Sequence, residues 1–137
     1  MTIRGAQKKD FDAIRTIIME LDLAYPSQSL DSFLVLEDKD RIIGIANLEE
    51  FDGFYFLSSV GVVEGFQRRG LASSFIRDLL KGLKKDVYLY TVIPGFFERL
   101  GFTAVARRSD LPLKMTFSCK ECTPDTCVTM VKHYGGS

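Results

Sequence analysis

The sequence predicts a mixed α/β (α+β) fold, in a single domain that covers residues 1–137. Short apolar runs typical of strands alternate with segments whose apolar residues recur at helical spacing. The chain is long enough for one hydrophobic core but not for two. It contains no internal repeat and no low-complexity linker. We therefore expect a mixed sheet with helices on its faces.

The first third of the chain predicts a strand and a helix. Residues 2–7 are short and alternate in polarity, as in a strand. Apolar residues then recur at helical spacing, which predicts an amphipathic helix over residues 10–23. Residues 25–29, Tyr-Pro-Ser-Gln-Ser, interrupt this pattern and leave room for only a short turn of helix.

The middle third predicts three strands and a second helix. Strands are expected over residues 33–37 and 41–48, joined by the tight polar turn 38–40. A long apolar strand follows over residues 54–63. After Gly70, apolar residues at helical spacing predict an amphipathic helix that ends near Leu83.

The last third predicts a buried strand over residues 87–92, because that run is short and highly apolar. Pro94 suits the first turn of a short helix, and Gly101 suits the position just after its end. Two further strands are expected over residues 102–107 and 128–134. The segment 109–126 contains two prolines and two cysteines and predicts a loop.

Composition excludes several classes of partner. Lysine plus arginine and aspartate plus glutamate both number 18, so no net charge favours nucleic acid or an anionic membrane. No apolar run reaches the roughly 18 residues that a membrane span needs. The first residues lack a secretory signal, and three cysteines are an odd number for a disulfide scaffold. We therefore expect a cytoplasmic protein.

Residues 67–72, Gln-Arg-Arg-Gly-Leu-Ala, lie between the long strand and the second helix. The first amides of a helix lack partners within it, and the helix dipole favours an anion there. Gly70 permits close approach of a ligand, and Arg68 and Arg69 add positive charge. This arrangement predicts a phosphate site. The alternative is an ordinary solvated helix start.

Two motifs together resemble those of the GCN5-related N-acetyltransferase (GNAT) superfamily. Residues 67–72 match its acetyl-CoA motif of Gln or Arg, two residues, Gly, one residue, then Gly or Ala. About 30 residues downstream, residues 96–102 read Phe-Phe-Glu-Arg-Leu-Gly-Phe and match its second motif. The resemblance implies one GNAT acetyltransferase domain and a mixed, mostly antiparallel sheet of about seven strands with helices on both faces. It also implies acetyl-CoA as the acetyl donor.

The resemblance assigns a set of cofactor-binding residues. In such enzymes the end of the strand before the first motif splays from its neighbour, and an amide of Val62 or Val63 would polarise the thioester carbonyl. The pyrophosphate would lie on the amides of residues 68–72. The implied cofactor-binding residues are Val60, Val62, Val63, Gln67, Arg68, Arg69, Gly70, Leu71, Ala72, Ser73 and Phe97.

Within the superfamily, the chain is most similar to the small N-acetylglutamate-synthase-like group. The likeness lies in Phe96 and Phe97, in residues 110–114 (Asp-Leu-Pro-Leu-Lys) and in the late cysteines. It implies transfer of an acetyl group to the α-amine of a small amino acid such as glutamate. Arg107 and Lys114 would then bind the carboxylate of that acceptor. The alternative for both residues is a solvated hairpin face.

The catalytic acid and base are less defined. Many superfamily members carry a tyrosine acid where Phe97 stands, and phenylalanine cannot donate a proton. Tyr90 could replace it, with Tyr88 as the alternative on the same strand. Glu64, after the long strand, and Glu50 or its neighbour Glu49 are candidates for a base that acts through water. Packing for the tyrosines and ordinary surface positions for the glutamates are the alternatives.

Cys119, Cys122 and Cys127 suggest a possible structural zinc site. His133 does not fit as the fourth ligand, because a strand would separate it from Cys127 by roughly 20 Å. Asp125, Glu121 or another subunit would have to complete the site. A redox pair or reduced loop cysteines are the alternatives.

Other functions remain open at this stage. The acceptor could instead be a polyamine, an aminoglycoside or a protein N-terminus. The chain could also be a non-catalytic module that senses an acyl-CoA, or a metal-stapled interaction domain. The expected partners are acetyl-CoA and a small amine, with a homodimer possible and no nucleic acid or membrane.

Overall fold

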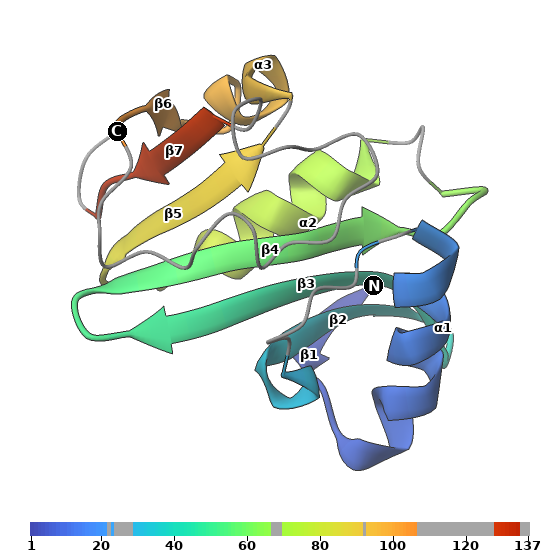
Figure 1. The fold of residues 1–137 in the computed structure, drawn as a ribbon. Coiled ribbons are helices and arrows are strands. Elements are labelled where there is room, and N and C mark those ends of the chain that lie inside the picture. Colours follow the sequence, from blue (N-terminus) through green and yellow to red (C-terminus); the bar gives the residue numbers. More distant parts are fainter. Residues whose placement is uncertain (22, 24–28, 67–69, 92, 107–127, 135–137) are drawn as a thin grey trace.

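A computed structural model describes residues 1–21, 23, 29–66, 70–91, 93–106 and 128–134 of the chain (Figure 1). The strands are β1 (Thr2–Gly5), β2 (Phe33–Asp38), β3 (Arg41–Phe51), β4 (Phe54–Val62), β5 (Asp86–Thr91), β6 (Thr103–Ala104) and β7 (Val128–Lys132). The helices in the described part are α1 (Phe11–Leu21), α2 (Leu71–Leu80) and α3 (Pro94–Glu98), with short 3-10 turns η1 (Lys8–Asp10) and η2 (Leu30–Ser32).

The strands form one seven-stranded sheet in the order β1-β2-β3-β4-β5-β7-β6. The pair β4–β5 is parallel, and the other neighbouring pairs are antiparallel. Helix α1 covers one face and α2 the other (Figure 1). Two glycines of the sheet face these helices: Gly44 of β3 faces Phe75 of α2, and Gly61 of β4 faces Leu21 of α1. The predicted mixed, mostly antiparallel sheet with helices on both faces is confirmed.

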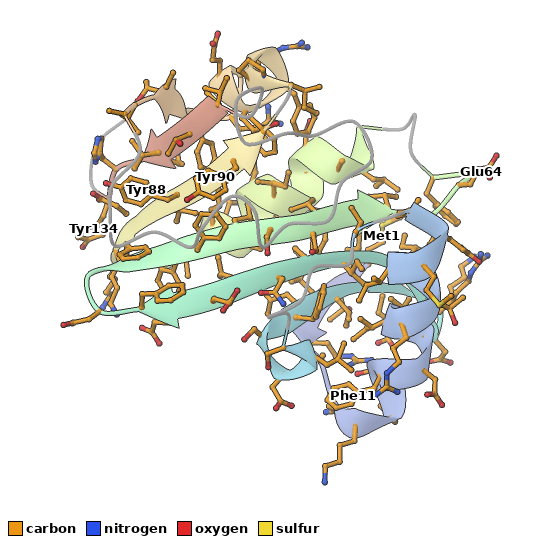
Figure 2. The ribbon with its side chains drawn as sticks, viewed as in Figure 1. Met1, Phe11, Glu64, Tyr88, Tyr90 and Tyr134 are labelled. Carbon is orange, nitrogen blue, oxygen red and sulfur yellow. The ribbon has the colours of Figure 1, made fainter. Side chains whose placement is uncertain are left out.

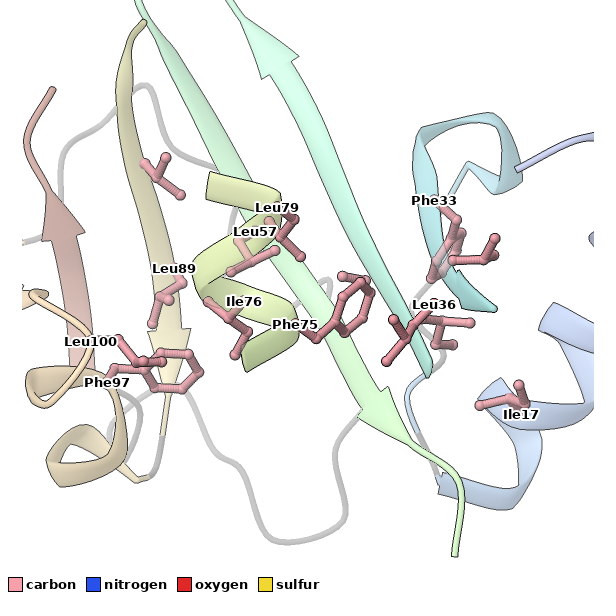
Figure 3. Packing of buried hydrophobic residues seen from close by; sticks show 14 of the residues in the cluster. Ile17, Phe33, Leu36, Leu57, Phe75, Ile76, Leu79, Leu89, Phe97 and Leu100 are labelled. Atoms are coloured by element: carbon pink, nitrogen blue, oxygen red, sulfur yellow. The ribbon is translucent and has the colours of Figure 1, made fainter. Parts of the chain in front are cut away.

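The core follows the predicted periodicity. In α2, Phe75, Ile76 and Leu79 are buried, whereas Arg77 and Asp78 between them are exposed. Figure 3 shows these three side chains against Leu57 of β4 and near Leu89 of β5. Burial of such apolar surface is the main favourable term in folding. The helical spacing in the sequence therefore identified the face of α2 that holds it to the sheet.

Several element bounds differ from the prediction. Strand β3 continues to Phe51 rather than ending near residue 48, because its last residues pair with β4 and the Phe51 and Phe54 rings stack with centroids 5.0 Å apart. Helix α2 ends at Leu80, three residues before the predicted end. Strand β6 is short, Thr103–Ala104, and occupies the sheet edge beside β7.

The N-terminal elements are joined by a cluster of charges around the buried side chain of Asp10. Arg4 donates to both of its carboxylate oxygens, at 2.6 and 3.0 Å, and also donates to Glu37 of β2 at 3.1 Å. The Gln7 amide donates to Asp10 at 2.8 Å. The hydrogen bonds from Arg4, supported by that amide, lower the pKa of Asp10 from its ordinary 3.8 to about 2. The cluster thus links β1, β2 and the start of α1.

Replacing Asp10 should destabilise the fold. A carboxyl group whose pKa is about 2 when folded and 3.8 when unfolded contributes about 2 kcal/mol at pH 7. This contribution exists above the unfolded pKa and is lost as the pH falls from about 4 to 2. We expect Asp10→Asn to lower the free energy of unfolding by about 2 kcal/mol in denaturant titrations at pH 7. The difference from wild type should narrow as the pH approaches 2.

Asp12→Asn is the matched control, because the fully exposed Asp12 carboxylate pairs with the exposed Arg15 at 3.2 Å. Such a surface pair contributes roughly 0–1 kcal/mol. Equal losses in the two variants at pH 7 would contradict the structural role of the Asp10 cluster.

Candidate functional site

The parallel strands β4 and β5 diverge toward their carboxyl ends (Figure 1). Their described pairing covers only Phe54–Phe56 of β4 against Asp86–Tyr88 of β5. Beyond it, β4 continues to Val62 and β5 to Thr91 without pairing to one another. Each strand keeps its other neighbour, β3 for β4 and β7 for β5. The sheet is thus open at a single junction between its described strands.

A bulge in β4 lies beside this opening. The register with β3 shifts between Ile45 and Asn47, so that Ser59 and Val60 both stand opposite Ala46. Ser59 has a φ of 50°, in the left-handed region that non-glycine residues seldom adopt. A bulge increases the local twist and bends its strand. We infer that this extra residue helps to turn the end of β4 away from β5.

A cavity of about 340 Å³ occupies the opening. Its lining comes from both faces of the sheet, since Leu21 and Leu23 lie on the α1 face whereas Ala72 and Ile76 belong to α2. The full lining is Leu21, Leu23, Val60, Gly61, Val62, Ala72, Ile76, Ile93, Phe96 and Phe97. The wall of the cavity is therefore almost wholly apolar.

The start of α2 adjoins the cavity. Gly70 has a φ of 68°, a conformation that favours glycine, and the helix begins at the next residue. Ser74 donates its amide to the Gly70 carbonyl at 3.1 Å, while Gly70 itself brings no capping side chain to the first turn. Ala72 of this turn lines the cavity. A helix N-terminus suited to an anion thus lies beside the opening.

The structure brings most of the predicted cofactor residues together. Val60, Val62, Ala72 and Phe97 line the cavity. Gly70, Leu71 and Ser73 lie in or beside the first turn of α2, next to Ala72. Gln67, Arg68 and Arg69 lie outside the described residues.

The two candidate amides at the end of β4 differ in position. The Val63 amide donates to the Ile43 carbonyl of β3 at 2.8 Å. Successive amides of a strand point to opposite sides, so the Val62 amide is directed toward the opening. The geometry therefore favours Val62 over Val63 as the amide that faces a bound carbonyl.

Tyr90, predicted as an acid, lies on the diverging part of β5. It shares the α1 face with Tyr88, and Figure 2 shows both rings on the same side of the sheet. The Tyr90 ring packs edge-on against Phe56 of β4, with centroids 5.0 Å apart. Tyr90 is half-buried and is not among the residues that line the cavity. Phe97 is buried and packs edge-on against Phe96 and Phe102.

The two predicted bases lie away from the cavity lining. Glu50 stands opposite Tyr55, before β4 and β5 diverge, and accepts a 2.9 Å bond from Lys85. Lys85 lowers the pKa of Glu50, which weakens it as a base. Glu64 is exposed after β4 and lines a separate charged cleft with Lys9 and Arg41. In Figure 2 it lies well away from Tyr90.

The remaining predicted site residues, Arg107, Lys114, Cys119, Cys122 and Cys127, lie outside the described residues. Within the described part of the chain, no group of three or more histidine, cysteine, aspartate or glutamate residues could hold a metal ion. Nor is any helix of that part long and apolar enough to cross a membrane. The predicted zinc site gains no support.

Sequence reasoning missed part of the lining, namely Leu21, Leu23, Gly61, Ile76, Ile93 and Phe96 as site residues. The helical pattern placed Leu21 in the general core. Gly61 did carry a signal, because a glycine inside a strand marks a close approach of other groups. That signal does not say which groups approach.

The family model described as "Acetyltransferase (GNAT) domain" matches residues 29–104. This range is more than half of the chain and includes β4, the opening and the start of α2. The chain belongs to the GNAT acetyltransferase family. This family consists of acetyl-CoA-dependent N-acetyltransferases. The cavity beyond the paired part of β4 and β5 is therefore the candidate site for acetyl-CoA.

Solved structures share this GNAT fold. N-acetylglutamate synthase from Neisseria gonorrhoeae, complexed with coenzyme A and N-acetyl-glutamate, matches with a TM-score of 0.73 and 19% identity over 97% of this chain. The match covers 35% of that protein, so the chain spans about a third of its length. Rv2747 from Mycobacterium tuberculosis, in complex with CoA and NLQ, matches with a TM-score of 0.72 and 17% identity, over 97% of this chain and 99% of that one.

The ribosomal-protein-S18-alanine N-acetyltransferase from Escherichia coli also matches, with a TM-score of 0.69 and 18% identity. That match covers 97% of this chain and 93% of the other. At these identities the likeness concerns the fold, which is common to enzymes of different acceptors.

A β-branched residue at position 70 should weaken coenzyme A binding. Nothing lies within 4 Å of a Cβ at Gly70, so the effect must come from its positive φ. We expect Gly70→Val to displace the first turn of α2 and raise the Kd for coenzyme A about tenfold, as measured by isothermal titration calorimetry. Gly70→Asn is the control, because asparagine tolerates this conformation better. If a folded Gly70→Val protein bound coenzyme A with wild-type affinity, the α2 N-terminus would not be part of the coenzyme A site.

Proposed function

We propose that the chain transfers the acetyl group of acetyl-CoA to the α-amine of a small amino acid such as glutamate. The observation that carries this proposal is the apolar cavity beyond the paired part of β4 and β5, which is lined from both faces of the sheet. It allows a thioester to enter beside α2 while an amine approaches from the opposite face. Acetyl-CoA as the acetyl donor follows from the family assignment. The identity of the acceptor is what we propose.

The site residues fit acetyl-CoA. The apolar wall suits the pantetheine arm, and the amides at the start of α2 suit its pyrophosphate. Bound acetyl-CoA supplies an activated acyl group with a thiolate as leaving group. The chain's own part is to hold the carbonyl at the Val62 amide, which stabilises negative charge on its oxygen, and to exclude water with apolar side chains.

Tyr90 is the proposed proton donor to the departing thiolate. It lies on the diverging part of β5 and on the α1 face, from which the amine would approach. Phe97 lines the cavity but has no proton to give. The phenol proton would pass to sulfur as the bond between carbon and sulfur breaks.

Glu64 is the proposed base, acting through water on the incoming amine. It follows the end of β4 and is exposed. Its support is the sequence position rather than the cavity lining. Glu50 has no part in this proposal, because its ion pair with Lys85 lies before the opening.

An amino-acid acceptor is favoured by the likeness to N-acetylglutamate synthase, described as bound to coenzyme A and N-acetyl-glutamate. In this chain Arg107 and Lys114 would bind the acceptor carboxylate. A protein N-terminus is the second candidate, since the S18-alanine enzyme and Arabidopsis thaliana Naa50 in complex with CoA-Ac-MVNAL share the fold.

The acceptor class can be read from thiol release. With acetyl-CoA present, we expect release of coenzyme A to rise most with glutamate and related amino acids, and little with polyamines or peptides. Lys114→Gln should raise the KM for glutamate about tenfold through loss of a charged hydrogen bond. Lys81→Gln, on an exposed lysine at the end of α2, is the control. Faster release with an N-terminal peptide than with any amino acid would reverse the acceptor assignment.

Tyr90→Phe should reduce kcat about a hundredfold while leaving the affinity for coenzyme A unchanged, because only the proton is removed. Tyr88→Phe is the matched control, since that ring is buried and packs edge-on against Phe54 at 5.6 Å. Both variants are compared by initial rates with the best acceptor. Equal kcat in wild type and Tyr90→Phe would exclude Tyr90 as the acid.

A further inference from the structure

Two leucines close the cavity on the α1 face. Leu21 and Leu23 both line it and both lie against Gly61 of β4. A Cβ on Gly61 would lie 2.6 Å from Leu21 Cδ1 and 2.8 Å from Leu23 Cδ1. Carbon atoms in contact prefer about 3.5–4.0 Å. No space for a further methyl group therefore exists between this strand and the two leucines.

Leu23 is held in place from two sides. Its amide donates to the Ile18 carbonyl of α1 at 2.9 Å. Its carbonyl accepts a hydrogen bond from the Ser59 hydroxyl at 2.9 Å. Ser59 is the bulge residue with positive φ, so the distortion that bends β4 also presents this hydroxyl to the chain after α1. A fixed backbone limits the positions that the Leu23 side chain can take.

The leucine pair lines the cavity on the face opposite to helix α2. The start of α2 marks the phosphate end, and Ala72 and Ile76 line the cavity from that face. Leu21 and Leu23 line it from the opposite face, next to Gly61 and Val62. An acyl group whose carbonyl lies at the Val62 amide would direct its carbon chain toward an apolar wall built by the two leucines.

We propose that Leu21 and Leu23 determine acyl-chain specificity by limiting the donor to a short acyl group, acetyl, and that Ser59 positions this wall. The inference rests on the proposed function, because it assumes that the cavity holds the thioester. Replacing either leucine by alanine removes the branched end of the side chain and leaves apolar space beside Gly61. Longer acyl chains would occupy that space.

Binding of acyl-CoAs tests this directly. The wild-type chain is titrated with coenzyme A, acetyl-CoA, propionyl-CoA and butyryl-CoA. A hydrophobic pocket discriminates one methylene by roughly 10- to 200-fold, so we expect butyryl-CoA to bind at least tenfold more weakly than acetyl-CoA. In Leu21→Ala and Leu23→Ala, the ratio of the Kd for butyryl-CoA to the Kd for acetyl-CoA (the butyryl-to-acetyl ratio) should fall about tenfold. Met19→Ala, on the same helix with an 81% exposed side chain, should keep the wild-type ratio.

The positioning role of Ser59 has its own comparison. Ser59→Ala should lower the butyryl-to-acetyl ratio about threefold, a smaller effect because the leucine side chains remain. A purely structural role would change stability without changing this ratio. Ser74→Ala, on the exposed side of α2, is the control. Should an alanine variant fail to fold, Leu23→Val removes less volume and should shift the ratio in the same direction.

The outcomes separate this inference from the proposed function. No amine enters the titration, so an incorrect acceptor assignment leaves it intact. A wild-type chain that binds no coenzyme A overturns both. Folded leucine variants that bind coenzyme A but keep the wild-type ratio overturn the leucine wall alone, as does a wild-type chain that binds all chain lengths equally.

Discussion

The loss of pairing between β4 and β5 is the constraint on which the site depends. Unpaired backbone groups inside a sheet are unfavourable unless other partners satisfy them. Here each strand retains its other ladder to the end. β4 stays paired with β3 as far as Val62, and the Val63 amide extends that contact to Ile43. β5 pairs with β7 as far as Thr91. The sheet therefore continues as two paired halves on either side of the opening.

The topology of the sheet places the start of helix α2 beside this opening. The helix connects β4 to the parallel strand β5, and such a crossover begins at the carboxyl end of the first strand. Its N-terminus must therefore lie where the strands separate. The proposed phosphate site and the apolar cavity are thus consequences of one topology.

Local patterns predicted most of the elements and the start of α2. The spacing of Phe75 and Leu79 identified the buried face of α2, and the glycine motif located its start. The choice between the Val62 and Val63 amides could not be made locally. It depends on the register between β3 and β4, where a shift of one residue reverses every direction. The bulge opposite Ala46 sets that register, and nothing in the sequence of β4 alone announces it.

The surroundings of the predicted base Glu50 and the role of Leu21 in the cavity wall could not be predicted from the sequence for a related reason. Glu50 stands at the end of the predicted strand, but β3 continues to Phe51 and turns Glu50 toward Lys85 from a distant segment. Leu21 shows helical periodicity like any core residue, and only its contact with Gly61 reveals a role at the site. Both facts depend on residues more than thirty positions apart along the chain.

Helix α1 connects the charge cluster around Asp10 to the wall of the cavity. Its first turn is fixed by Asp10, which Arg4 ties to β1 and β2. Its last residue, Leu21, contacts Gly61, and Leu23 just beyond is fixed by Ser59. The eleven residues of this helix span about 16 Å between the two ends. The charge cluster at one end and the bulge hydroxyl at the other therefore set the position of the cavity wall together, so fold stability and acyl selectivity share one element.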